Sequence, residues 1–223
     1  MRSTSALTRR PMGVRQEPYG GLWPYLTGLR CAGCGAPGSP WCSLCADSLL
    51  ASTTSHRQSG AVERLTVLAA DTGPVGRLVR RWKDGPDASL SGIIAGLGRV
   101  AAASLPSGSE PSMVTWVPSA RGRRRSRGFE PGRVVAGGVG RHLGVRPVRL
   151  LRRLDSATQR GRDASHRQTD IRISSRGRVM GDVLLVDDVV TTGASMQVAA
   201  DALRRSGARR VTGLAILQRS LKG

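Results

Sequence analysis

Short apolar runs alternate with helical patterns along most of this chain of 223 residues. An apolar run bounded by turn residues predicts a buried strand, and apolar positions that recur every three or four residues predict a helix. Strands are predicted at residues 65–71, 113–117, 147–150, 183–186 and 210–217. Helices are predicted at residues 75–83, 90–105, 133–143 and 196–206. This alternation predicts an α/β fold in which helices flank a parallel sheet.

The chain divides into three regions of different character. Residues 1–29 are rich in Arg, Gly and Pro and are expected to be disordered or irregular, with Met12 as an alternative start. Residues 30–50 contain every cysteine and are expected to form a small metal-binding module. Residues 62–220 hold the predicted strands and helices and are long enough for one α/β domain. Within that domain, the polar residues 152–178 are predicted to form a long loop with one helical turn.

The cysteines form two Cys-x2-Cys pairs, Cys31 with Cys34 and Cys42 with Cys45. One such turn places two sulfur atoms on the same side of a metal, and two turns complete a tetrahedral thiolate shell. Four thiolates leave no open coordination position, so the spacing predicts a structural zinc ion that stabilises a segment too short to build its own core. An iron–sulfur cluster, or pairs that have lost their metal, are the alternatives.

Residues 183–195 read Val-Leu-Leu-Val-Asp-Asp-Val-Val-Thr-Thr-Gly-Ala-Ser, a buried strand followed by two acids and a polar turn. In open α/β sheets, ligands bind just beyond the carboxyl ends of the strands. The carboxylates of Asp187 and Asp188 can accept hydrogen bonds from ribose hydroxyls, and the turn offers hydroxyls and backbone N–H groups at a helix N-terminus. The chemistry therefore favours a sugar phosphate. The predicted phosphate-binding turn consists of Val190, Thr191, Thr192, Gly193, Ala194 and Ser195.

Other interpretations of this segment explain less. A Walker B strand would need a Gly-Lys-Ser/Thr loop elsewhere, and the two lysines of the chain, Lys83 and Lys222, lie in no such loop. A plain helix cap explains neither the second acid nor the order of the turn residues. Because successive residues of a strand point to opposite faces, Asp187 and Asp188 are expected to have unequal roles unless the strand ends between them.

The segment resembles the signature by which type I phosphoribosyltransferases bind 5-phosphoribosyl-1-pyrophosphate (PRPP). Other motifs occur in a matching order: the cysteine pairs, Trp-Lys-Asp-Gly at residues 82–85, Arg-Gly-Phe at residues 127–129, and then Gln159 and Arg167. Taken together, these motifs resemble the ComF family of bacterial phosphoribosyltransferase-like proteins, which is named for competence and DNA uptake. The resemblance covers roughly residues 30–220.

The resemblance implies a type I phosphoribosyltransferase-like fold and a set of roles. Asp187 and Asp188 would be the catalytic acids, and Gln159 and Arg167 would lie in a mobile loop over the substrate. The residues implied on the pyrophosphate side are Lys83, Ser119, Arg123 and Arg127. The family usually has Asn-Gln after Arg-Gly-Phe, whereas this chain has Glu130-Pro131, which puts the acceptor substrate in doubt.

Two functions follow from the resemblance. The first is binding of Mg-PRPP, with Mg²⁺ as cofactor, and transfer of ribose 5-phosphate to a nitrogen nucleophile. The alternative is a non-catalytic accessory or nucleic-acid-binding protein of DNA uptake that retains an inherited PRPP loop and meets an uptake-machinery protein. Both an enzyme and a binding protein are consistent with the sequence.

The charge of the chain is strongly positive, with a formal net charge of +20. Residues 111–223 carry 23 basic and 8 acidic residues, so the excess lies with the predicted phosphate-binding half. Such a field attracts polyanions, but that half offers few aromatic residues on which bases can stack. The pattern predicts weak, salt-sensitive binding of single-stranded DNA centred on residues 121–127. No apolar run approaches the ~18 residues that a membrane span needs and no signal core is present, so a cytoplasmic location is expected.

Overall fold

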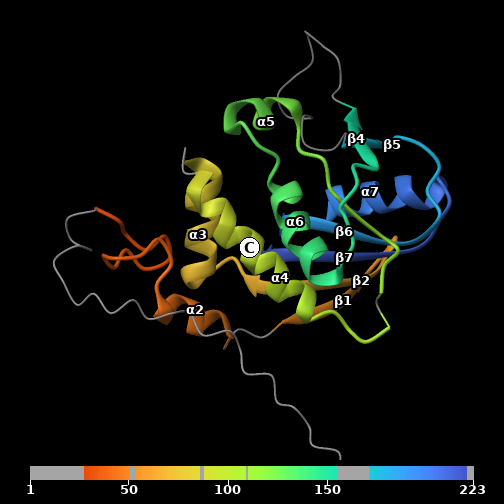
Figure 1. Ribbon diagram of the computed structural model, residues 1–223. Coiled ribbons are helices and arrows are strands. Elements are labelled where there is room, and N and C mark those ends of the chain that lie inside the picture. Colours follow the sequence, from red (N-terminus) through yellow and green to blue (C-terminus); the bar gives the residue numbers. More distant parts are fainter. Residues whose placement is uncertain (1–27, 51–53, 86–87, 109, 155–170, 220–223) are drawn as a thin grey trace, which may run out of the picture.

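The computed structural model describes residues 28–50, 54–85, 88–108, 110–154 and 171–219 (Figure 1). The helices are α2 (Ser43–Leu50), α3 (Gly73–Asp84), α4 (Ser91–Ala103), α5 (Arg121–Arg127), α6 (Pro131–Leu143) and α7 (Ala194–Arg205), with a 3-10 turn at Ala88–Leu90. The strands are β1 (Ser55–Ser59), β2 (Val62–Ala70), β3 (Met113–Trp116), β4 (Leu151–Leu154), β5 (Arg172–Ser175), β6 (Gly181–Val190) and β7 (Ala208–Gln218). No helix within these ranges is long and apolar enough to cross a membrane.

The central sheet has the strand order β1-β2-β7-β6-β3. Strands β2, β7, β6 and β3 run parallel, and β1 joins the edge of β2 antiparallel. Parallel neighbours are joined by crossovers that place helices on the faces of a sheet. The predicted α/β fold with a parallel sheet flanked by helices is therefore confirmed.

Two apolar layers cover the two faces of this sheet. Helices α3, α4 and α6 bury their apolar sides on one face, and α7 packs on the other together with the small β4–β5 hairpin (Figure 1). The strand β6 serves both layers, because Leu184 and Val186 face the first and Val183 and Leu185 face the second. This alternation explains why residues 183–186 form a continuous apolar run.

The predicted strand at residues 147–150 is wrong. The backbone N–H of Val148 does donate to Val114 O at 2.8 Å, but that of Leu150 donates to the hydroxyl of Thr115 at 3.3 Å. Because this second bond goes to a side chain, no regular ladder continues along β3. The strand β4 begins one residue later, at Leu151, and pairs antiparallel with β5. Part of the predicted 152–178 loop is therefore a β-hairpin.

Helices α4 and α6 approach each other so closely that backbone meets backbone. A Cβ atom added at Gly138 would lie 1.9 Å from Ala95 O, and one added at Gly98 would lie 2.6 Å from Val135 O. Neither position could hold a side chain unless the helices moved apart. The two helices therefore form one tightly packed layer over the sheet.

The cysteine-containing segment packs against the N-terminal half of α3. Ala32 and Leu49 belong to the same apolar core as α3, and Arg77 Nε donates a hydrogen bond to Gly33 O. A Cβ atom added at Gly33 would meet Trp41, Cys45 Sγ and Pro74, all within 3.0 Å. The predicted module thus shares a tight interface with the α/β core.

Candidate functional site

The predicted phosphate-binding turn lies at the carboxyl end of β6 and beneath the N-terminus of α7. Gly193 adopts a left-handed conformation with φ of 84°, which favours glycine and lets the chain reverse into the helix. Thr192 Oγ1 accepts a hydrogen bond from the backbone N–H of Ala194 at 3.3 Å, and Thr191 O accepts one from Gln218 Nε2 at 3.0 Å. One hydrogen bond within the turn and one from the neighbouring strand β7 therefore fix its backbone.

A pocket of about 600 Å³ opens on this turn. Its wall runs through residues 189–196, with Asp187, Ile171 and Val198 completing it. The first backbone N–H groups of a helix have no partners within the helix, and the helix dipole places partial positive charge there. The pocket therefore joins one carboxylate to an environment that favours an anion.

Asp187 is half-buried and lines this pocket. Its Oδ1 accepts a hydrogen bond from the backbone N–H of Asp188 at 2.9 Å. Burial raises the pKa of the Asp187 carboxyl well above its usual value, and the neighbouring carboxylate of Asp188 adds to the effect. A cation or a hydrogen-bond donor in the pocket would favour the ionised form, so the carboxyl is suited to meet one.

Asp188 has different surroundings. Its side chain is buried on the α3 side of the sheet, where Lys83 Nζ lies 2.6 Å from Oδ2. This contact is a close ion pair between two largely buried side chains. Because β6 continues to Val190, the two acids lie on opposite faces, as expected for a strand that does not end between them.

Two motifs that are distant in sequence meet at the end of α3. Arg127 Nε donates to Lys83 O at 2.9 Å, and its Nη2 lies 4.0 Å from Asp84 Oδ1. Two residues along, the ring of Phe129 packs on Trp82 with a centroid separation of 4.8 Å. The Arg-Gly-Phe segment therefore fixes the end of the helix that carries Lys83.

The remaining predicted pyrophosphate-side residues lie between β3 and α6. Residues 121–127, predicted as an arginine cluster, form the short helix α5, on which Arg123 is exposed. The backbone N–H of Ser119 donates to Glu130 Oε1 at 3.3 Å, and Glu130 itself is buried. Gln159 and Arg167 lie outside the described residues.

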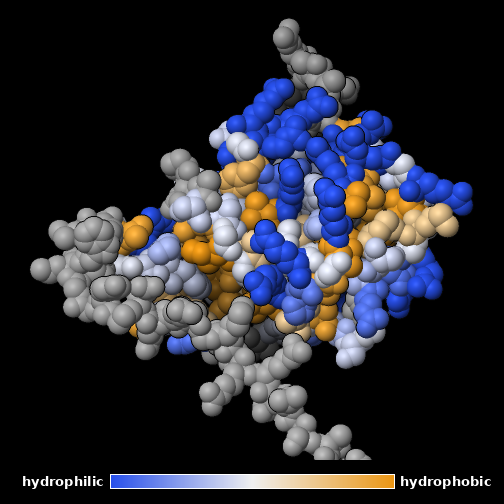
Figure 2. Space-filling view, in the orientation of Figure 1, coloured by the Kyte–Doolittle hydropathy of each residue, from blue (hydrophilic) through white to orange (hydrophobic). Residues whose placement is uncertain are grey.

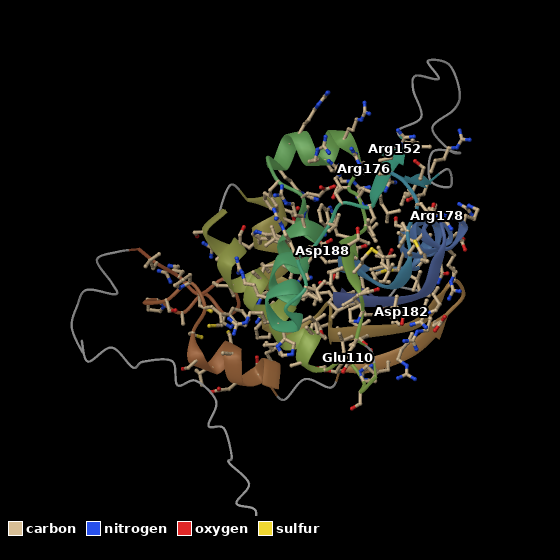
Figure 3. All side chains as sticks on the ribbon, turned by 45° about the vertical axis from the view of Figure 1, so that its right-hand side comes forward. Glu110, Arg152, Arg176, Arg178, Asp182 and Asp188 are labelled. Carbon is tan, nitrogen blue, oxygen red and sulfur yellow. The ribbon has the colours of Figure 1, made fainter. Side chains whose placement is uncertain are left out.

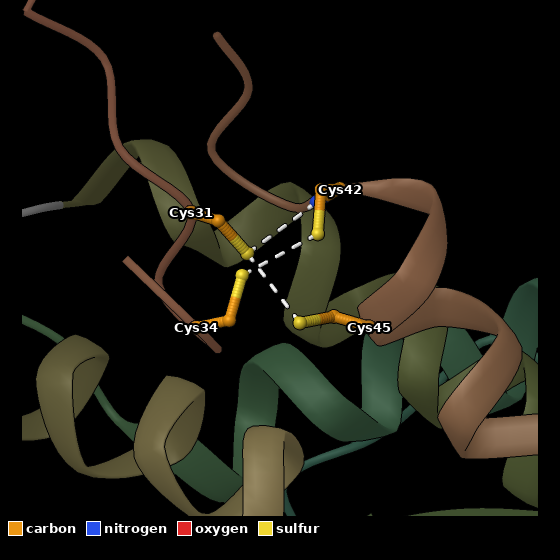
Figure 4. A group of neighbouring side chains, drawn as sticks. All are labelled: Cys31, Cys34, Cys42 and Cys45. Atoms are coloured by element: carbon orange, nitrogen blue, oxygen red, sulfur yellow. Dashed lines mark hydrogen bonds between the residues drawn. The ribbon is translucent and has the colours of Figure 1, made fainter. Parts of the chain in front are cut away.

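The four cysteines form one cluster beside α3. Their sulfur atoms all lie within 4.8 Å of one another and point toward a common centre (Figure 4). The pairs Cys31–Cys45 and Cys34–Cys42 are each separated by 3.6 Å between sulfurs. Tetrahedral zinc with Zn–S bonds of about 2.3 Å separates its sulfur ligands by about 3.8 Å, so the cluster fits a metal ion such as zinc.

The surroundings of Cys31 favour the ionised form of its thiol. Burial raises the pKa of Cys31, but hydrogen bonds from backbone N–H groups, including those of Cys42 and Gly33 at 3.4 Å, outweigh it and lower the pKa to about 6. Burial raises the pKa of Cys45, as do the neighbouring thiols. A thiolate that accepts backbone N–H bonds is an arrangement found around bound metal, where the ligand must be deprotonated.

Sequence reasoning missed two features of the site. One is Glu130, which holds the backbone of Ser119; its only signal was its position as a lone acid after a run of arginines. The other is the pairing of Lys83 with Asp188, which joins residues 105 positions apart. The rarity of lysine in the chain was the available hint, because 33 of its 35 basic residues are arginine and Lys83 is one of two exceptions.

Comparison with known proteins bears on this architecture. No protein-family model matches the chain. An adenine phosphoribosyltransferase of Streptomyces galbus is 38% identical over 110 residues, which cover 44% of this chain and 59% of that protein. One of Streptomyces coelicolor is 38% identical over 94 residues, which cover 41% of this chain and 50% of that protein. The chain thus spans between half and three-fifths of the length of these relatives. Its fold is phosphoribosyltransferase-like, and both of these relatives are phosphoribosyltransferases.

Proposed function

We propose that this chain binds Mg-PRPP in the pocket between Asp187 and residues 191–195 and transfers ribose 5-phosphate to a nitrogen nucleophile, as a ComF-like protein of the cytoplasm. The observation that carries the proposal is the pocket itself, in which a half-buried carboxyl faces the N-terminus of the 12-residue helix α7. The carboxyl suits ribose hydroxyls, and the helix N-terminus suits the 5-phosphate. The phosphoribosyltransferase homologues support the same chemistry.

The residues of the chain would share the work of positioning. Asp187 would accept hydrogen bonds from the ribose, while the turn would hold the 5-phosphate through backbone N–H groups. Lys83, Arg123, Arg127 and the backbone at Ser119 would face the pyrophosphate and stabilise its growing negative charge as it leaves. Mg²⁺, when bound with PRPP, would neutralise further charge on the leaving group. Gln159 and Arg167 would cover the substrate.

The two acids would contribute differently. Asp187 opens on the pocket and is the carboxyl able to contact substrate. Asp188 pairs with Lys83 and would set the position of that ammonium group instead. Both relatives are named as adenine phosphoribosyltransferases, so adenine is the first nucleobase to test as the acceptor nucleophile.

Isothermal titration calorimetry with PRPP, with and without Mg²⁺, tests the proposal. The Thr192→Ala, Gly193→Val double variant should abolish binding, because valine cannot easily adopt φ of 84° and would fill the cradle. The matched control is Asp201→Ala, an exposed position on the same helix. A nucleobase screen for pyrophosphate release then tests turnover. Absence of PRPP binding by the wild-type protein with magnesium present contradicts the proposal.

A second candidate function is weak binding of single-stranded nucleic acid. Hydrophilic residues gather over α5 and β4 and continue across α6 on one face of the molecule (Figure 2). Arg123 and Arg125 are exposed on α5 and could contact phosphates without reading bases. This surface is the observation that favours an accessory role in DNA uptake, where a protein of the uptake machinery would be a further partner.

Fluorescence anisotropy with a labelled oligonucleotide across a salt series tests this second candidate. Changing Arg123, Arg124 and Arg125 to serine should remove binding, whereas changing Arg176, Arg178 and Arg205 should not. Arg127 is left intact because it holds the end of α3. Binding that survives high salt, or that is equal in both triple variants, would place the nucleic-acid surface elsewhere.

A further inference from the structure

A second polar pocket lies away from the phosphate-binding turn, beside the edge strand β3. Its volume is about 390 Å³, and α6 and the segment at residues 146–149 form its sides. It shares no lining residue with the pocket at residues 187–198. A volume of this size accommodates a small phosphorylated molecule as well as a simple anion. The charged and aromatic side chains that line it are Trp116, Glu130, Arg133, Arg146 and Arg149.

The charge of this pocket favours an anion. Three arginines and a single carboxylate line the pocket, and no ion pair of Arg133 or Arg146 is found within the described residues. Arg149 Nη2 lies 3.9 Å from Glu130 Oε1, at the outer limit of an ion pair. Guanidinium groups match the geometry of phosphate oxygens and bind them through paired hydrogen bonds. The arginines are exposed and therefore accessible to a ligand from solvent.

The indole of Trp116 provides an independent observation. Its Nε1 is buried and finds no acceptor among the described residues, although the side chain lines the pocket. Buried indole N–H groups usually donate to a partner. We expect this group to donate to an oxygen of an anion held by the arginines. The pocket therefore combines two arginines that have no ion pair within the described residues, Arg133 and Arg146, with a buried indole N–H that has no acceptor there.

Glu130 connects this pocket to the proposed PRPP site. Its Oε1 accepts the backbone N–H of Ser119 at 3.3 Å and is the same oxygen that faces Arg149. An anion that attracts Arg149 would remove a competitor for that oxygen and change how firmly Ser119 is held. Ser119 belongs to the loop assigned to the pyrophosphate side.

We infer that the pocket lined by Arg133, Arg146 and Arg149 is a second anion site, which takes inorganic phosphate or a phosphomonoester and adjusts the Ser119 loop through Glu130. Anion binding at this pocket does not depend on the proposed function. The adjustment of PRPP binding does rest on it. The two parts therefore need separate measurements.

Binding is tested with inorganic phosphate in the Thr192→Ala, Gly193→Val background, which removes the first anion site. Calorimetry should show one remaining site, and the quenching of tryptophan fluorescence that accompanies it should disappear in Trp116→Phe. Arg133→Gln with Arg146→Gln should weaken phosphate binding at least tenfold. The matched control, Arg99→Gln with Arg141→Gln, changes two exposed arginines on α4 and α6 that do not line the pocket and should bind as the background does.

Either of two binding results would overturn the site, and a chloride control adds a third. One is equal phosphate binding by the pocket variant and the control variant, and the other is no saturable binding at millimolar phosphate. If Trp116→Phe does not fold, the stoichiometry from calorimetry decides in its place. A chloride titration at matched ionic strength distinguishes a phosphate site from nonspecific attraction of anions to the basic surface. A response to chloride equal to the response to phosphate would show that the pocket has no specific phosphate site.

The coupling is tested in the protein with an intact turn. Phosphate competes with PRPP at the turn equally in both arginine variants, so any difference between them reports the pocket. We expect phosphate to change the PRPP dissociation constant at least twofold more in the control than in the pocket variant. Glu130→Gln should abolish this difference, and its phosphate affinity is measured in parallel because Glu130 lines the pocket. Equal responses would overturn the coupling. Absence of PRPP binding in every variant would reject the proposed function and leave the anion site standing.

Discussion

Asp187 and Asp188 are adjacent carboxylates whose surroundings differ because they lie on opposite faces of β6. Asp187 opens on the pocket, and burial, together with the neighbouring Asp188, raises the pKa of its carboxyl well above the usual value. Asp188 is enclosed on the other face and paired with the ammonium group of Lys83. One acid is thus available to a ligand, and the other fixes a cation in place. A pair of acids in a strand therefore provides two separate functions, since alternation separates their electrostatic environments.

A third acid on the same strand extends the comparison. Asp182 lies toward the other end of β6, far from Asp188 (Figure 3). Arg209 Nε and Nη2 donate to its two oxygens at 2.8 Å, and Arg210 adds a further ion pair. These hydrogen bonds lower the pKa of Asp182 to about 2. The strand therefore carries Asp182, which is paired with two arginines, near one end, and Asp187, which opens on a pocket, near the other.

The largest effect is expected from breaking the pair on the α3 face. Asp188→Ala leaves the ammonium group of Lys83 without its partner in a site where only 21% of the lysine side chain is exposed. Removing one partner of a buried ion pair costs about 3–5 kcal/mol, and partial exposure reduces this to about 2–3 kcal/mol of unfolding free energy. Urea denaturation measures the change. Lys83→Met combined with Asp188→Leu should recover most of it, and failure to recover would show that the charge pair is not the cause.

A gain in stability, rather than a loss, is expected when the acid on the pocket face, Asp187, is changed. Because the pKa of Asp187 is raised in the folded state, its contribution to stability is fully present below the pKa of a free carboxyl and declines as pH rises toward the folded pKa. Asp187→Asn removes this cost and should stabilise the ligand-free protein at pH 7 by about 1 kcal/mol, or about 2–4 °C in Tm. The gain should vanish at pH 4, and Mg-PRPP binding should weaken. Thermal unfolding at both pH values decides the matter, and a destabilised variant at pH 7 would contradict the assignment.

Removal of the metal should loosen the α3 face of the sheet and have only a small effect on PRPP binding. The cysteine segment packs on α3 through Gly33 and Arg77, and the same helix carries Lys83 at its other end. Protein purified without chelator should contain one zinc, and Cys34→Ser should lose it, expose mainly residues 30–50 to hydrogen exchange and weaken PRPP binding about threefold, or about 0.6 kcal/mol. Leu44→Ser, an exposed position in α2, is the control. Unchanged PRPP affinity without the metal would show that α3 is held by the core alone.

The effect expected at Asp182 is on stability alone, and it depends on pH. Its lowered pKa gives stability that is present above about pH 4 and declines as pH falls toward 2. Asp182→Asn should remove this acid-dependent portion and leave Mg-PRPP binding unchanged, since the residue does not line the pocket at residues 187–198. Urea midpoints at pH 7 and pH 3 measure it. If the difference between variant and wild type is the same at both pH values, the arginines do not hold the carboxylate as described.

The parts of this fold that the sequence predicts well are those whose chemistry is local. The parallel sheet follows from apolar runs, and the cysteine cluster follows from a spacing of a few residues. The break after β6 and the start of α7 follow from Thr192 and Gly193, because a glycine between hydroxyl residues and an apolar helix marks a turn. In each case, neighbours in sequence determine the geometry.

The parts that the sequence does not predict depend on residues that meet only in the folded chain. Nothing near Lys83 indicates that its partner lies on β6, and nothing near Glu130 indicates that it accepts the N–H of Ser119. The arginine-rich residues 121–127 have no apolar stripe, yet they form a helix that ends at Gly128 in a left-handed conformation. Sequence patterns report burial and turns, whereas these contacts depend on how the layers pack.

The contact between α4 and α6 has a consequence for recognising distant relatives. At Gly138 and Gly98 the space for a methyl group is already taken by the carbonyl oxygens of Ala95 and Val135. Two positions 40 residues apart therefore act as a paired fingerprint for this helix spacing. A homologous chain with a larger residue at one of them must separate its helices or lack this layer. The two positions therefore distinguish chains that share this helix packing from chains that resemble this one only at residues 183–195.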